Sequence, residues 1–249
     1  MNARAVQLYV SLLVVALVWL HLFAERFEKN WGFNALAQWP PAGKWALAGL
    51  AVATLIPPVN AGLRRLLAKV ARAWNAALGR RPRLARAAIV LAALGLFWAF
   101  RSNFLPFDSD AMDWIEMAEE GKRFHFKEPL ATYTFHLAYR WLSPFGLDAP
   151  TTIALVVCLC GAIFVWALLR ACETLAEDGA GRAVLFALVA TTGMMQVFFG
   201  HIETYGPLVA GMMVYAFLAL RCLVTPTASV IPAAVAFSVT CCVHLSAGL

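Results

Sequence analysis

Charged residues are scarce in this chain of 249 residues, and the scarcity excludes an ordinary water-soluble protein. They make up 14% of the sequence, whereas 62% of the residues are hydrophobic. A soluble domain carries about 25% charged and about 45–50% apolar residues. Because the apolar excess must face lipid, we predict an all-α protein, a polytopic transmembrane helix bundle.

Paired cysteine motifs, internal repeats and low-complexity tracts are also absent from the sequence. Of the six cysteines, Cys158, Cys160, Cys241 and Cys242 lie inside apolar runs, where free thiols behave as small buried hydrophobes. No second pair accompanies Cys158 and Cys160, so a zinc site is not indicated. The sequence therefore predicts a single membrane domain without a disulfide framework.

Acidic residues are missing from one strongly basic stretch between two apolar segments. Its basic residues are Arg64, Arg65, Lys69, Arg72, Arg80, Arg81, Arg83 and Arg86. The net charge of +6 is thus concentrated in one loop, which indicates a cytoplasmic loop against anionic lipid and not a nucleic-acid-binding surface. Part of the loop is predicted to lie in the membrane interface as a basic amphipathic helix.

Seven apolar segments are long enough to be predicted spans. They are residues 5–24, 44–63, 84–100, 151–169, 183–202, 206–223 and 230–249. With the basic loop inside, the N-terminus is cytoplasmic and the long loop 101–150, where acids outnumber bases, is external. We expect a bacterial inner (plasma) membrane, with residues 1–83 forming two N-terminal spans and the basic loop, and residues 84–249 forming the membrane core.

Two amphipathic helices are predicted within the external loop. Asp108 or Ser109 can cap the first, which ends near Glu120. The second begins at Glu128-Pro129, where proline suits the first helical turn. It carries one apolar stripe, formed by Leu130, Tyr133, Leu137 and Trp141. Both helices are expected to lie flat against the membrane or the top of the bundle.

Two aspartates open the external loop and are candidates for chemistry. Asp108 and Asp110 stand two residues apart, and carboxylates at this spacing can share Mg²⁺ or Mn²⁺, which commonly bridges to phosphate oxygens. One carboxylate can instead act as a general base toward an acceptor. The alternative is structural: Asp and Ser at this place simply cap the following helix.

Further ionisable residues lie at the predicted external ends of the spans. His201 and Glu203 end the fifth span, and ionisable groups at membrane depth are costly enough to be functional candidates. Placement in the aqueous interface is the alternative. His244 lies near the outer end of the seventh span, where packing between helices explains it equally well. His125 and Glu128 lie between the two external helices.

These features together resemble the GT-C superfamily of membrane glycosyltransferases, which take a sugar from a polyprenyl-phosphate carrier. The first large external loop of that family carries an Asp-containing motif, which Asp108-Ser109-Asp110 matches. The segment from Gly200 to Pro207 is similar to a Gly-x-x-Glu-x-Tyr-x-Pro pattern of bacterial members. Glu128-Pro129-Leu130, at the start of the second external helix, also fits. The resemblance covers roughly residues 84–249.

The resemblance implies a transfer of sugar from a polyprenyl-phosphate donor to a glycan, lipid or protein acceptor at the periplasmic or external face. Asp108 or Asp110 would be the catalytic base, and both would be ligands of a divalent cation, Mg²⁺ or Mn²⁺. His201 or Glu203 would orient the acceptor, the phosphate or the metal. The remaining expected substrate-binding residues are Tyr205, Glu128 and the external cations Arg101 and Lys127, with Lys122 and Arg123 also available.

Two other readings stay open. GT-C enzymes usually have more spans and often a further external part, so the resemblance implies that this chain is an N-terminal portion. A non-catalytic membrane assembly subunit is one alternative. A transporter or channel is the other, although no pair of Gly/Pro-broken spans carries charges near mid-bilayer, where transported substrates bind.

Overall fold

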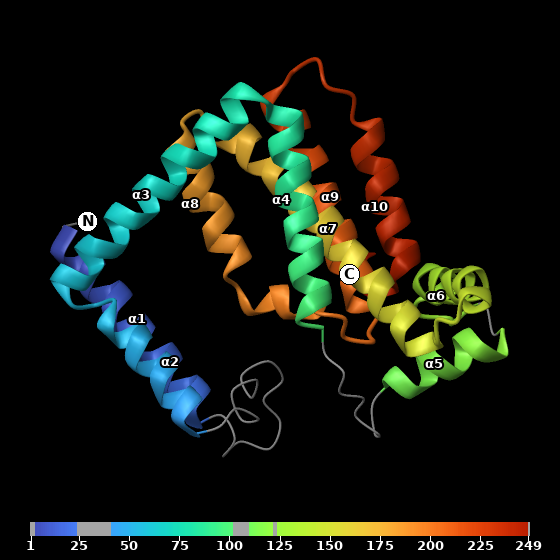
Figure 1. Ribbon diagram of the computed structural model, residues 1–249. Helices are drawn as coiled ribbons and strands as arrows, with labels where there is room; N and C mark the ends of the chain where they lie inside the picture. The colour runs from blue at the N-terminus through green and yellow to red at the C-terminus, as the bar shows by residue number, and fades with distance from the viewer. Residues whose placement is uncertain (1–2, 24–40, 102–109, 122–123, 249) are drawn as a thin grey trace. The chain divides into compact units, whose positions relative to one another are not determined.

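The computed structural model describes residues 3–23, 41–101, 110–121 and 124–248. All regular secondary structure in these ranges is helical (Figure 1), so the all-α prediction is confirmed. The chain divides into two compact units, Met1–Arg72 and Ala73–Leu249. The division falls inside helix α3 (Pro57–Arg80). This division into compact units does not test the predicted boundary between residues 1–83 and 84–249.

The first unit contains α1 (Ala3–Phe23), α2 (Pro41–Ala53) and the start of α3. Helices α1 and α2 pack against each other. The predicted span 44–63 is not one continuous helix, because the chain bends by 90° between α2 and α3. Pro57 and Pro58 explain the break, since proline has no N–H to donate to the preceding turn.

Three helices are long and apolar enough to cross a membrane: α4 (Pro82–Ala99), α7 (Ala149–Leu175) and α9 (Tyr205–Val224). Counting the bent pair α2–α3 as one span would make four among the described residues. Helices long and apolar enough to cross a membrane thus lie at the predicted spans 84–100, 151–169 and 206–223, as expected of a membrane protein. The predicted total of seven is not confirmed.

Helix α7 is the core of the second unit, with α4 and α9 packed along it (Figure 1). Gly161 makes the close approach possible, because a Cβ there would lie 2.7 Å from both the Phe97 ring and Phe198. Small residues at such crossings bring membrane helices into van der Waals contact. Helices α4 and α7 run antiparallel: Arg86 near the start of α4 pairs with Glu173 near the end of α7.

Two predicted spans are shorter helices than expected. In place of a helix over 183–202, α8 (Gly179–Ala190) is followed by a 3₁₀ segment, η4 (Gly193–Phe198). In place of 230–249, α10 (Ile231–Val243) ends where His244 becomes extended. All six cysteines are free: Cys158 is buried as predicted, Cys172 is buried as well, but Cys242 in α10 is exposed.

The loop predicted to be external contains the two predicted helices, α5 (Asp110–Glu120) and α6 (Pro129–Leu142). They pack against each other and against α7. The predicted stripe on α6 is not the face that meets the bundle: Ala131, Thr132 and Phe135 are buried, whereas Leu137 and Trp141 are exposed. Phe124, Phe126 and Phe145 are also exposed, and the Phe124 ring stacks on Tyr133 of the stripe at 5.3 Å; exposed aromatic residues of this kind suit a membrane interface.

The helix ends of the second unit fall into two groups. The group that we call the acidic end holds Asp110, Glu128 and Glu203, with the start of α9 and the end of α10. The group that we call the arginine end holds Arg86, Arg170 and Arg182, with the start of α4 and the end of α7. Helix α4 runs from the arginine end to the acidic end, where the Cβ of Arg101 lies beside Gly200.

Candidate functional site at the acidic end

Glu128 is the centre of a polar cluster at the acidic end. Its side chain is buried, with 7% of the residue exposed. The carboxylate contacts two imidazoles: Oε2 bonds to Nδ1 of His125, and Oε1 lies 3.0 Å from Nε2 of His244. A carboxylate oxygen accepts hydrogen bonds, so a ring nitrogen that faces Glu128 is the donor when it carries the hydrogen. The cluster therefore joins both histidines to one carboxylate.

Local structure at the start of α6 places Glu128. Pro129 occupies the first helical turn, where its missing N–H costs no hydrogen bond. The Thr132 hydroxyl donates to the Glu128 carbonyl (2.9 Å) and lies 3.0 Å from the backbone N–H of His125, which donates to it. One further bond closes the arrangement: the backbone N–H of Leu245 donates to the Lys127 carbonyl (2.9 Å). The segment after α10 is thereby tied to the loop before α6.

Each histidine also contacts an aromatic ring from another helix. His125 packs edge-to-face on Trp114 of α5, with ring centroids 5.2 Å apart. His244 stacks on Tyr205, the first residue of α9, at 5.7 Å. The carboxylate of Glu128 thus links side chains from four elements. Through the two histidines it is connected to the buried Trp114 and to the exposed Tyr205.

Glu203 lies beside this cluster, in the turn before α9. Burial, together with the negative charges of Asp110 and Glu128, raises its pKa to about 7. The nearby Trp114 indole opposes that rise, although its buried N–H forms no hydrogen bond with any described residue. Asp110 is exposed at the first position of α5. At neutral pH Glu203 is therefore a carboxyl group close to half protonated, beside the exposed Asp110.

The other predicted site residues lie at the same end but make fewer contacts. Arg101 is half-buried, with its guanidinium 4.2 Å from the centre of the Trp98 ring, and it packs beside Gly200, whose φ of +68° favours glycine. Lys127 is exposed, with its ammonium 5.4 Å from the Phe126 ring. His201 is exposed and its ring bonds to no other described residue.

The acidic end thus brings together three predicted residues, Asp110, Glu128 and Glu203. Tyr205 joins them through His244. The sequence did not predict that His125 and His244 share Glu128, nor that Trp114 lies against Glu203. The available signal was the common location of these residues at predicted external helix ends. Asp108, Lys122 and Arg123 lie outside the described residues.

A metal site at Asp108 and Asp110 stays a prediction. Among the described residues, no group of three or more His, Cys, Asp or Glu side chains has the arrangement of a metal site. Both oxygens of Glu128 are engaged by histidines, which leaves Asp110 and Glu203 as the available carboxylates nearby. Mg²⁺ commonly uses one or two carboxylates and completes its shell with water and substrate phosphate, so these residues fit such an ion only with those additional ligands.

Comparison of the chain with protein-family models, with curated proteins and with solved structures finds no match. The residues of the acidic end, and the resemblance of their motifs to those of GT-C glycosyltransferases, are therefore the basis for proposing a function.

Proposed function

We propose that the protein is a membrane glycosyltransferase of the GT-C type, which moves a sugar from a polyprenyl-phosphate donor to a glycan, lipid or protein acceptor. The observation that carries the proposal is the approach of two carboxyl groups, Asp110 and Glu203, beside the buried Glu128 cluster. This pair lies at one end of a bundle whose helices are long enough to span a membrane. A lipid-linked donor would reach that end laterally from the bilayer.

The chemistry is a single displacement at the anomeric carbon. Asp110, or Asp108, accepts the proton of the acceptor hydroxyl as its oxygen forms a bond to that carbon. The bond between the carbon and the carrier's phosphate oxygen breaks, its electron pair leaves with polyprenyl phosphate, and the anomeric configuration inverts. Glu203, with its pKa raised to about 7, supplies the neutral carboxyl that can donate a hydrogen bond to a phosphate oxygen.

Recognition of the donor's phosphate requires positive charge. Arg101 and Lys127 are the described cations of the predicted site, and guanidinium and ammonium groups are common phosphate ligands. In the proposal His201 and Tyr205 complete the substrate contacts. A divalent cation, Mg²⁺ or Mn²⁺, would be held by Asp108 and Asp110 and would neutralise phosphate charge.

The proposal includes a topology. The arginine end lies in the cytoplasm of a bacterium with the N-terminus, and the acidic end faces the periplasm across the inner membrane, in accord with the preference of basic loops for the cytoplasm. Seven crossings then require α1, the bent α2–α3 pair, α8 with η4, and α10 to cross together with α4, α7 and α9. Accessibility labelling of cysteines placed at 80, 110 and 203 tests this: 110 and 203 should react with an impermeant reagent from one side and 80 from the other.

The direct test is sugar transfer by the purified protein in lipid vesicles, with a panel of polyprenyl-phosphate sugars and radiolabelled product detection. Asp110→Asn should reduce turnover at least about 100-fold, the scale of a lost general base. Glu203→Ala, which removes the hydrogen-bond donor, should also reduce turnover, whereas Glu203→Gln keeps a neutral donor and should reduce turnover less. Glu119→Gln is the matched control, because Glu119 is exposed on the same helix as Asp110. Full activity in Asp110→Asn and in Glu203→Ala would refute the assigned roles, and solute flux without covalent product would favour a transporter.

A further inference from the structure

A second polar site lies at the arginine end, away from the proposed catalytic residues. A cavity of about 400 Å³ opens there between the end of α3, the start of α4, the end of α7 and the start of α8. Its lining consists of Asn75, Gly79, Arg86, Glu173, Gly179 and Arg182. The volume falls within the range of about 300–1,000 Å³ that is usual for small-molecule sites.

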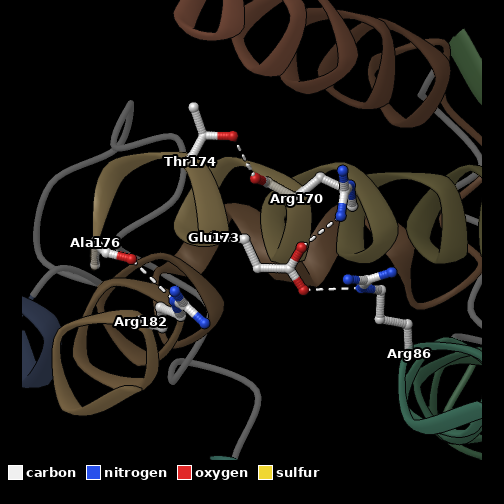
Figure 2. A network of polar contacts seen from close by, with 6 residues as sticks. All are labelled: Arg86, Arg170, Glu173, Thr174, Ala176 and Arg182. Carbon is white, nitrogen blue, oxygen red and sulfur yellow. Dashed lines mark hydrogen bonds and ion pairs between the residues drawn. The ribbon is translucent and has the colours of Figure 1, made fainter. Parts of the chain in front are cut away.

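Glu173 holds Arg86 in place without cancelling the local positive charge. Arg86 donates from Nε to Oε1 of Glu173 (2.8 Å), and Arg170 donates from Nη1 to Oε2 (2.5 Å), as Figure 2 shows. One carboxylate thus serves two guanidinium groups, and this trio keeps a net charge of +1. A guanidinium has five N–H donors. Neither Nη group of Arg86 makes a hydrogen bond to any residue that the structure describes.

Arg182 is oriented by backbone carbonyls, which leave its charge uncompensated. Its Nε donates to the Ala176 carbonyl (2.9 Å) and its Nη2 to the Glu177 carbonyl (2.8 Å). Figure 2 shows the first of these bonds together with the Arg86 pair. The adjacent Asp178 carboxylate is used as the cap of α8, accepting from the N–H of Gly181 (2.6 Å). The cavity is therefore lined by two pre-oriented guanidinium groups with donors to spare.

Oriented guanidinium pairs match the oxygens of a phosphate group, which accept paired hydrogen bonds. The half-buried Asn75 adds an amide to the lining. Arg86 lies in the second turn of one candidate span and Glu173 in the last turn of another, so the cavity lies at the level where a spanning bundle meets the headgroups. Basic pockets between membrane helices bind anionic headgroups on these grounds.

We propose that this cavity binds a phosphate group, held between Arg86 and Arg182. The phosphate belongs either to an anionic phospholipid headgroup or to a soluble phosphate compound, which share this chemistry. The proposal does not depend on the glycosyl transfer proposed for the acidic end.

The test is calorimetric titration of the full chain in a neutral detergent with two probes, short-chain phosphatidylglycerol and inorganic phosphate. Arg182→Gln should weaken binding at least tenfold. It leaves the bonds of Glu173 to Arg86 and Arg170 in place and removes the two bonds from Arg182 to the Ala176 and Glu177 carbonyls, so the free energy of unfolding is measured alongside. Arg221→Gln is the control, since Arg221 is exposed on α9 and does not line the cavity.

The two probes separate the sources of the phosphate. Binding of phosphatidylglycerol alone, lost in Arg182→Gln, assigns the site to a lipid headgroup; binding of inorganic phosphate with the same loss assigns it to a soluble compound. Failure of both probes to bind would overturn the proposal, as would equal affinity in Arg182→Gln and Arg221→Gln. Arg86→Lys tests the geometry of the donors: it keeps the positive charge but removes the paired N–H groups of the guanidinium, and it should also weaken binding.

Discussion

The bond between Glu128 and His244 should make a measurable contribution to stability. The Oε1–Nε2 distance is 3.0 Å, and the two residues are 9% and 12% exposed in their side chains. Hydrogen bonds to charged groups contribute about 1.5–3 kcal/mol, and burial places this one toward the upper part of that range. Because His244 has other contacts, a single substitution would mix several losses. The coupling free energy from a double-mutant cycle isolates the pair.

The cycle consists of the wild type, Glu128→Gln, His244→Ala and the double variant, with free energies of unfolding measured by denaturant titration in detergent. We expect a coupling of about 2 kcal/mol. A control cycle replaces His244→Ala by His136→Ala, because His136 bonds to the Ala118 carbonyl and not to Glu128. That control should couple by less than about 0.5 kcal/mol. Equal coupling in the two cycles would refute the assigned network.

Two further outcomes follow from the same structure. Gly161→Ala should lower the free energy of unfolding by about 1–3 kcal/mol through overpacking, since the new Cβ would lie 2.7 Å from Phe198 Cβ. Gly95→Ala is the control and should not lower it, because nothing lies within 4 Å of a Cβ at that position. Equal losses of stability in the two variants would contradict the packing argument. Because the pKa of Glu203 rises from 4.5 to about 7 on folding, the folded state binds more protons between these values and stability should fall as pH rises through that window. Unfolding titrations from pH 4 to 8 should show this slope in the wild type and a smaller slope in Glu203→Gln, and identical slopes would exclude Glu203 as its source.

The sequence predicted the helical elements best where composition and local signals agree. The apolar runs of α4, α7 and α9 and the proline at the start of α6 predicted those helices to within a few residues. The span predicted over 183–202 differs because an apolar run does not reveal where a helix stops. Thr191 and Thr192 donate their hydroxyl hydrogens back to the carbonyls of Ala187 and Val189, a local alternative to continued helix.

The candidate site was predictable in location but not in its bonds. Alternation of spans across the membrane predicted that Glu128, Glu203 and His244 share one end. The partner of His244 depends on how far α10 extends toward α6, and sequence spacing does not specify such a register. The apolar stripe on α6 left open whether that face meets the membrane or the top of the bundle, because periodicity cannot distinguish a face that meets protein from one that meets lipid; the exposed Leu137 and Trp141 turn it away from the bundle.

The bond from the Leu245 N–H to the Lys127 carbonyl has a consequence for sequence change at the acidic end. Main-chain groups carry it, so almost any side chain at either position leaves donor and acceptor intact. Proline at 245 is the exception, because it removes the N–H. Variation among side chains can therefore alter the surface of this end while the attachment between its two segments persists.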